Sequence, residues 1–176
     1  MPTIQLNGRT HGKPRKQMRR VPSEKCITLN REFEKLRLLA YPCESDKWTI
    51  GWGGTFYESG EPVKQGDAIS EGRANELHRF HMELFARQVN ACLKSTVNQD
   101  QFDALVDFNF NTGRLCKSTL IEIVNADPNH PDIEMMFLRW KYSKGKISEG
   151  IIRRRLSQIC LYRKGELKYD WTEEEI

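Results

Sequence analysis

Apolar residues recur at helical spacing through most of the second half of the chain. The pattern predicts a long helix over 70–93, beginning at a serine N-cap. A second helix is expected over 98–111, and Gly113 follows where a C-terminal glycine stop belongs. Shorter helices are predicted over 118–125 and 132–140. A last helix carries apolar residues at i, i+4, i+7 and i+8, namely Ile152, Leu156, Ile159 and Cys160.

The region before residue 70 is patterned differently. Apolar residues from Arg31 to Ala40 fall on one helical face, and Tyr41-Pro42 should end that helix, because the residue before a proline disfavours helical geometry. Residues 48–57 mix β-branched and aromatic side chains with glycines, and 58–62 read as a turn, which predicts a small antiparallel ribbon. The expected fold class is therefore α+β: one helix and a ribbon, then a long helix, then a helical bundle.

Composition narrows the class of protein. A chain of 176 residues with 38% hydrophobic residues can bury the core of one ordinary domain. No stretch approaches the ~18 apolar residues of a membrane span, and the polar, basic N-terminus is unlike a secretory signal. The five cysteines show neither CxxC nor Cys/His ligand spacing, so we expect no disulfide framework and no metal or other cofactor.

The positive charge is concentrated at the N-terminus. Residues 1–30 carry a net charge of +6, and residues 31–176 sum to −2. We expect residues 1–26 to form a basic flexible arm and residues 27–176 to form the main domain. A solvated tail is the favoured interpretation of the arm. An anionic partner such as nucleic acid or a wall polymer is the alternative, but no interleaved aromatic residues support single-strand stacking.

Three residues before position 50 are candidates for chemistry. Glu34 lies late in the predicted first helix, Cys43 just past its end, and Thr49 at the start of the ribbon. A helix end that folds back on a hairpin would bring a carboxylic acid, a thiol and a hydroxyl together at the rim of a cleft. By itself this signal is weak, since a glutamate on a short surface helix is more often solvated than catalytic.

The same segment resembles a known family. Eight residues separate Glu34 from Cys43 and five separate Cys43 from Thr49, the spacing found in the active-site region of phage lysozymes (endolysins) of glycoside hydrolase family 24. The resemblance covers about residues 27–165. Its landmarks follow in the family's order: 33–43, 48–53, 98–106, 108–113, 118–120, 137–140 and 150–155.

The resemblance implies a fold and a reaction. The fold would be lysozyme-like, with a small helix-and-hairpin lobe joined by a long helix to a helical lobe and a cleft between them. The reaction would be hydrolysis of the β-1,4 bond between N-acetylmuramic acid and N-acetylglucosamine in peptidoglycan. Glu34 would be the general acid, Cys43 and Thr49 would position a water in an inverting reaction, and Asn111 would contact substrate.

Cys43 stands where most family members have aspartate, and several roles are open to it. A thiol is mostly protonated near neutrality, so it can hold a water without being a strong base. As a thiolate it could act as a base or attack the anomeric carbon. The alternative without chemistry is a small buried apolar residue.

Two departures from the family pattern concern structure. Gly54 replaces the histidine that family members commonly carry after the Gly-x-Gly of the hairpin, and 142–146 replaces the Ala/Gly-Gly loop after the Arg-Trp pair. The first threatens local stability more than chemistry, and the second makes substrate contacts from that loop insecure.

The remaining candidate residues have more ordinary interpretations. Cys92 and Cys160 are expected in the core, and a bridge from Cys26 to Cys43 is the less favoured alternative to two thiols. One arginine of 153–155 should neighbour Glu34, with the others solvated. Trp140, His78 and His81 are expected to be packing residues. A sugar platform is the less favoured alternative for Trp140, and a surface position is the alternative for the two histidines.

The leading functional hypothesis is a monomeric muramidase made in the host cytoplasm, which needs a holin-type protein for release and acts on the cell wall in the periplasm. A virion-associated lysozyme and a protein that only binds peptidoglycan are the alternatives. A pure binder has no need of the acid at position 34. A nucleic-acid-binding module would rest on the basic arm alone, so no nucleic-acid partner is expected.

Overall fold

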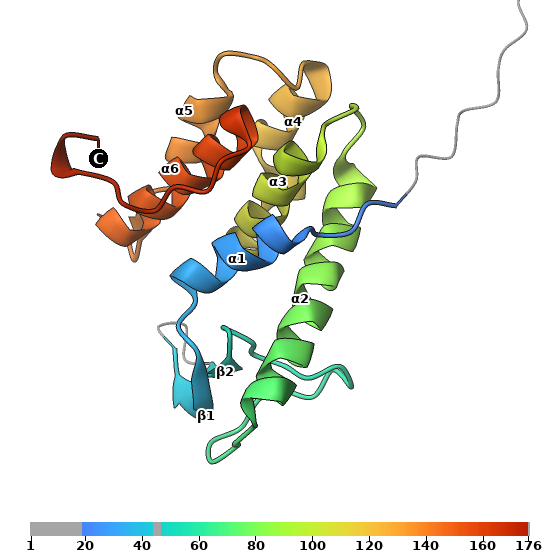
Figure 1. Cartoon of the computed structure of the whole chain (residues 1–176), viewed down its shortest axis with the longest axis vertical. Coiled ribbons are helices and arrows are strands. Elements are labelled where there is room, and N and C mark those ends of the chain that lie inside the picture. The colour runs from blue at the N-terminus through green and yellow to red at the C-terminus, as the bar shows by residue number, and fades with distance from the viewer. Residues whose placement is uncertain (1–18, 44–46, 176) are drawn as a thin grey trace, which may run out of the picture.

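The computed structural model describes residues 19–43 and 47–175, which form a mostly helical molecule with two short β-hairpins (Figure 1). The α+β class predicted from the sequence is confirmed. The helices and strands, in chain order, are α1 (Glu24–Phe33), β1 (Arg37–Pro42), β2 (Trp48–Gly51), α2 (Glu71–Cys92), α3 (Gln99–Thr112), η1 (a 3₁₀ turn, Leu115–Lys117), α4 (Thr119–Ala126), α5 (Ile133–Leu138), β3 (Tyr142–Ser143), β4 (Lys146–Ile147), α6 (Glu149–Lys164) and η2 (Glu173–Glu175).

The first helix lies earlier in the chain than the sequence predicted. Ser23 caps α1 by accepting a hydrogen bond from the Lys25 N–H, so the helix begins at Glu24, inside the segment expected to be an arm. The helix expected over 31–40 is wrong, because Arg37–Pro42 forms strand β1. The apolar face that suggested a helix is not buried, since Leu39 is 69% exposed.

Strands β1 and β2 form the small lobe of the molecule. They pair antiparallel, with Tyr41 opposite Thr49 and Pro42 opposite Trp48. Ile50, Val63 and Leu77 form a small core that fixes this lobe against the first half of α2. The antiparallel ribbon predicted over 48–57 is thus present, but its first strand, β2, pairs mainly with β1, which precedes the predicted segment.

The long helix α2 runs from this small lobe to the main helical lobe (Figure 1). It begins after Ser70, whose side chain accepts from the Arg73 N–H, as the sequence predicted. The helix predicted from Asn98 is α3, which starts with reciprocal capping between Asn98 and Gln101 and stops at Gly113 in the left-handed conformation (φ 62°).

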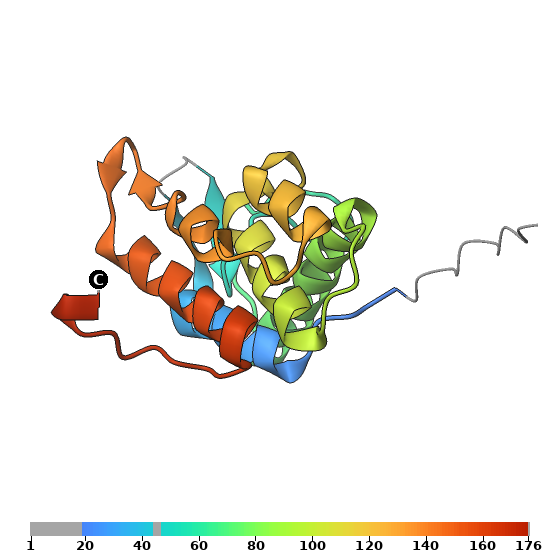
Figure 2. The same ribbon diagram turned by 90° about the horizontal axis from the view of Figure 1, so that it is seen from above.

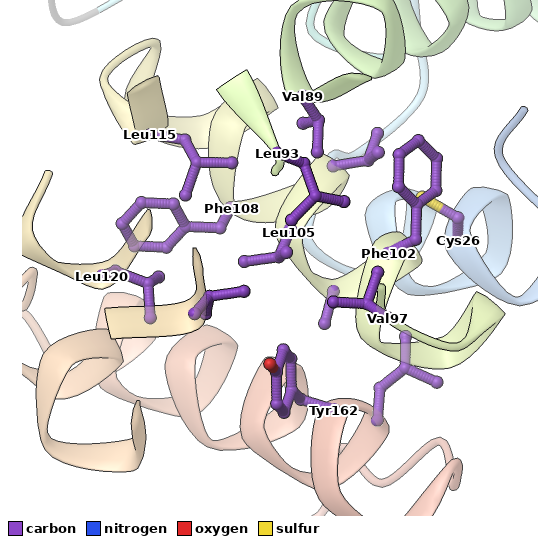
Figure 3. Close-up of a cluster of buried hydrophobic side chains, with 14 of the residues drawn as sticks. Cys26, Val89, Leu93, Val97, Phe102, Leu105, Phe108, Leu115, Leu120 and Tyr162 are labelled. Carbon is purple, nitrogen blue, oxygen red and sulfur yellow. The ribbon is translucent and has the colours of Figure 1, made fainter. Parts of the chain in front are cut away.

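Helix α3 is the centre of the large lobe. It lies between α2 and α6, with α1 packed across it (Figures 1 and 2). Its residues from Gln101 to Asn109 are all buried, which is why its sequence is apolar on more than one face. Figure 3 shows Phe102, Leu105 and Phe108 of α3 projecting into the main core.

The remaining helices close the lobe around α3. Helix α4 follows the Ser118 N-cap and matches the expected segment, whereas α5 is shorter than the predicted 132–140. Tyr142 and Ile147 pair in the β3–β4 hairpin between α5 and α6. Helix α6 buries Ile152 and Cys160, as its spacing predicted.

The cysteines form a disulfide that the sequence analysis did not expect. Cys92, the last residue of α2, is bonded to Cys116 in η1, with the two Cα atoms 5.5 Å apart. The core position expected for Cys92 is therefore corrected to a partly buried disulfide at the edge of the core. Cys26 is a fully buried thiol whose Sγ lies 3.4 Å from the Asp103 carbonyl oxygen, within α1 rather than bridged to Cys43.

Candidate active site

Glu34 lies at the junction between α1 and the hairpin. It is the residue just after α1, where its φ and ψ of −106° and 102° turn the chain out of the helix. Its backbone N–H still donates to the Asn30 carbonyl at 3.0 Å. The side chain is 21% exposed, so the carboxylate is held by the fold and still reaches solvent.

One oxygen of this carboxylate contacts a buried arginine. Arg154 of α6 donates from Nη1 to Glu34 Oε1 at 2.6 Å, and its Nε and Nη2 donate to the two oxygens of Asp107 on α3 at 3.1 and 2.7 Å. The arginine expected to neighbour Glu34 is therefore Arg154. Burial lowers the pKa of Arg154, but Asp107 and then Glu34 outweigh it, so the net pKa is raised.

The hairpin backbone approaches the other side of Glu34 closely. A Cβ placed on Gly53, whose φ is +82°, would lie 2.8 Å from Glu34 Oε2. A side chain at this position would therefore collide with the carboxylate as well as strain the backbone. The glycine lets the turn after β2 lie directly against the acid.

Cys43 and Thr49 lie at the turn end of the β1–β2 hairpin. The Cys43 N–H donates to the Lys47 carbonyl at 2.9 Å, and Thr49 Oγ1 lies 3.4 Å from the same oxygen. Thr49 is buried (3% exposed) and Cys43 is half-buried. Cys43 thus follows a strand rather than a helix, but it lies beside Thr49 as the spacing suggested.

Tyr41 links this end of the hairpin to Glu34. Burial is the main cause that raises the pKa of Tyr41. The charge of Glu34 raises this pKa further, Arg37 lowers it, and Cys43 adds a smaller increase. Tyr41 is also opposite Thr49 in the ladder, so it lies beside Thr49 and is near enough to Glu34 and Cys43 for both to affect its pKa.

Asn111 lies on a hollow at the end of α3. Its Oδ1 accepts a hydrogen bond from Nη2 of Arg155, and Glu34 is not among the residues that line this hollow of about 470 Å³. The lining residues are Asn111, Thr112, Arg114, Arg139, Trp140, Tyr142, Ser143, Ile151 and Arg155. Asn111 is thus held by Arg155, the residue that follows Arg154, and Arg154 in turn contacts Glu34.

Comparison with known proteins decides the family. The family model described as Phage lysozyme matches residues 31–158, which include Glu34, Cys43, Thr49, Asn111 and Arg154. The chain belongs to the phage lysozyme family.

The chain is similar to several proteins named endolysin. It is 37% identical over 150 residues to the endolysin of Bacillus phage B103, a match that covers 83% of this chain and 55% of that protein. It is 30% identical over 148 residues to the endolysin of Acyrthosiphon pisum secondary endosymbiont phage 1, covering 80% and 96%. The chain thus spans just over half the length of the Bacillus phage endolysins it matches.

Solved structures confirm the lysozyme-like fold. The endolysin from Escherichia coli O157:H7 phage FAHEc1 aligns with a TM-score of 0.74 and 30% identity, over 83% of this chain and 95% of that one. P22 lysozyme aligns with a TM-score of 0.68 and 26% identity, over 81% and 98%.

A histidine from α2 fills the space beside Gly54. A Cβ on Gly54 would lie 2.7 Å from Cε1 of His81, whose Nε2 is 2.9 Å from the Phe56 carbonyl oxygen. His81 is buried, so it is the packing residue that was expected and does not lie at the surface. Burial is the main cause of its lowered pKa. The imidazole of His81 therefore occupies the space that a side chain at Gly54 would need.

Sequence reasoning missed the buried polar groups around Arg154. Asp107 and Asn30 are both fully buried and hydrogen-bonded to one another, and Arg155, expected in solvent, is 1% exposed. Burial is the main cause that lowers the pKa of Arg155 to about 9. An aspartate inside the apolar run of α3 was the signal available for Asp107; nothing local marks Asn30.

Trp140 packs as predicted. Its ring meets Phe108 edge-on, with centroids 5.6 Å apart. Within residues 19–43 and 47–175, no three or more His, Cys, Asp or Glu side chains gather where they could hold a metal ion. In the same residues no helix has the length and apolar character needed to cross a bilayer.

Proposed function

We propose that this phage lysozyme is an endolysin muramidase that hydrolyses the β-1,4 bond between N-acetylmuramic acid and N-acetylglucosamine in peptidoglycan. The observation that carries the proposal is the placement of Glu34. Its solvent-reaching carboxylate is held by Arg154 and lies against the hairpin that carries Cys43 and Thr49.

Glu34 is the general acid of the proposed reaction. Cleavage of a glycosidic bond needs a proton donor at the leaving oxygen. Arg154 occupies Oε1, so Oε2, which faces the turn at Gly53, is the oxygen that delivers the proton. The glycan would then lie along the hairpin side of the carboxylate.

Cys43 and Thr49 position the attacking water. Both contact the Lys47 carbonyl at the turn end of the hairpin, Cys43 through its backbone N–H and Thr49 through its hydroxyl, and a thiol and a hydroxyl can hold one water between them. Attack by water on the face opposite the leaving group inverts the anomeric centre. Covalent attack by a Cys43 thiolate would instead lead to retention.

Asn111 contacts the substrate from the large lobe. Its exposed side chain is oriented by Arg155 at the rim of the hollow that ends α3. An amide can donate to and accept from a sugar or an N-acetyl group at once.

The substrate places the enzyme at the bacterial wall. The named relatives are endolysins, which supports a role in host-cell lysis. We propose that a monomer accumulates in the host cytoplasm, passes the membrane with a holin-type protein and acts in the periplasm. Peptidoglycan is its partner, with no nucleic acid involved.

Product analysis tests this function. Purified peptidoglycan treated with the protein should release muropeptides with N-acetylmuramic acid at the new reducing end, initially as the α-anomer detected by proton NMR. Glu34→Gln, folded to the same extent, should release none. Products cleaved elsewhere, or equal release by Glu34→Gln, would overturn the proposal. Initial β-anomer would overturn the water-positioning role of Cys43 alone.

A further inference from the structure

A buried histidine on α2 takes no part in the chemistry described so far. His78 is 1% exposed and lies between α2 and α1. Its Nε2 is 2.8 Å from Asn30 Oδ1, and its Nδ1 is 3.3 Å from Arg31 Nε. Both ring nitrogens therefore contact α1, the helix that ends just before Glu34.

The direction of each hydrogen bond is fixed by Asp107. Asn30 Nδ2 donates to Asp107 Oδ1 at 2.7 Å, since the opposite amide orientation would set two oxygens against each other. Asn30 Oδ1 therefore faces His78, whose Nε2 must donate, and Nδ1 accepts from Arg31. Burial, followed by the charge of Arg31, lowers the pKa of His78 to about 3, so the neutral ring keeps this tautomer at neutral pH.

Asp107 connects these contacts to α6, where it accepts hydrogen bonds from Arg154 and Gln158. Its Oδ1 accepts from Asn30 and from Arg154 Nη2, and its Oδ2 accepts from Arg154 Nε and from Gln158 Nε2 at 2.5 Å. Two atoms of the guanidinium are thereby held by one buried carboxylate. The third, Nη1, is left pointing at Glu34.

We infer that His78 is a positioning residue for Glu34. Its Nε2–H holds the Asn30 amide, that amide holds Asp107, and Asp107 orients the guanidinium of Arg154 against the catalytic carboxylate. The contacts join α2, α1, α3 and α6 in one continuous hydrogen-bonded chain. This inference rests on the proposed function, because it assigns His78 a part in placing the proposed acid.

Loss of the Nε2–H should act on the rate rather than on binding. Without it, Asn30 Oδ1 is a buried acceptor with no donor, and the amide is free to turn away from Asp107. A shift of the guanidinium then moves Glu34 from the leaving oxygen, and misplacement by ~1 Å costs up to about 100-fold in rate. We expect His78→Leu to lower kcat about tenfold and to leave KM within about twofold.

Conservative and matched variants separate positioning from packing. His78→Gln carries an amide N–H that can reach Asn30, and should restore kcat to within about threefold of the native value. His81→Leu removes another buried imidazole of α2, one that contacts the Phe56 carbonyl instead, and should lower the melting temperature without a comparable loss of kcat. Rates are measured on solubilised peptidoglycan, below the melting temperature of every variant.

Coupling to Asn30 supplies a second readout. The double variant His78→Leu/Asn30→Ala should be no slower than the slower single variant, because both changes interrupt the same chain. If His78→Leu does not fold, His78→Asn should show the same loss of kcat, since its shorter amide cannot reach Asn30.

The outcomes distinguish this inference from the proposed function. Native kcat in His78→Leu, or an equal loss in His81→Leu, would overturn the positioning role while Glu34→Gln remains inactive. An active Glu34→Gln would instead overturn the proposed function itself.

Discussion

Cys43 is a thiol at the position where the family resemblance leads one to expect aspartate. If it holds the attacking water with Thr49, removal of its sulfur should slow the reaction by about 10- to 100-fold in Cys43→Ala. Cys43→Asp should stay within about tenfold of native, because a carboxylate can also hold the water. Steady-state rates on solubilised peptidoglycan measure both; an unimpaired Cys43→Ala would show that the thiol only fills space.

Gly54 is a position where size matters more than backbone freedom. Its added Cβ in Gly54→Ala would lie 2.7 Å from His81 Cε1, so we expect a loss of about 1–3 kcal/mol in the free energy of unfolding. Urea denaturation measures this loss. In Gly72→Ala, where the nearest atom is Ser70 Oγ at 3.9 Å, the same change should not destabilise the protein.

A second change at the helix identifies the cause. His81→Ala, made in the Gly54→Ala background, should recover part of the lost stability because it removes the atom that collides. Fully additive losses in the two variants would show that the imidazole is not what excludes a side chain at Gly54.

The sequence pointed to candidate residues of the site but not to their surroundings. Glu34, Cys43 and Thr49 could be singled out because they lie within sixteen positions of one another. Asp107 and His78 lie on separate helices far along the chain. Their contacts with α1 exist only after folding, so no local spacing could reveal them.

Among the elements, the α2–η1 junction depends on the Cys92–Cys116 disulfide. The bond closes a loop of 24 residues in sequence separation, so its loss should cost about 3 kcal/mol. Reduction with dithiothreitol should lower the melting temperature by roughly 6–12 °C. Cys116→Ser should melt at the reduced protein's temperature with or without reductant. If Cys116→Ser instead melted at the temperature of the oxidised native protein, the disulfide would not be stabilising.

Helices with caps were predicted well, but the junction between α1 and β1, where Glu34 lies, was not. The Ser70 cap and the Gly113 stop lie where the sequence placed them, and Asn98 and Ser118, the first residues of two predicted helices, cap α3 and α4. The apolar residues of β1 imitate a helical face, although Leu39 is exposed and the segment pairs with its neighbours in a sheet. Periodicity alone cannot separate the two when the apolar side chains are not in a core.

At the scale of the whole molecule, acid should weaken the fold over a defined range of pH. The folded pKa of His78 is about 3 against an ordinary 6.5, so the unfolded chain binds the additional proton between these values. Stability is therefore fully present above pH 6.5 and falls as the pH drops towards 3, by several kcal/mol at most, on the order of 1.4 kcal/mol per pH unit. The lowered pKa of His81 acts in the same direction.

Urea unfolding measured at a series of pH values tests this dependence. His78→Gln, which has no titrating ring, should show a shallower decline between pH 6.5 and 4. The raised pKa of Asp103, caused mainly by burial, opposes the trend and is common to both proteins. An identical decline in the native protein and His78→Gln would contradict the assignment of His78 as a buried neutral imidazole.

The two lobes meet at the carboxylate of Glu34, which joins α1 to the hairpin and contacts α6. The central claim is that this carboxylate is the acid that cleaves the peptidoglycan glycan. Its most direct test is the loss of turbidity of outer-membrane-permeabilised Gram-negative cells, with native protein and Glu34→Gln at equal folded concentration. We expect clearing by the native protein and at least ~100-fold slower clearing by Glu34→Gln. Equal clearing by both would contradict the central claim.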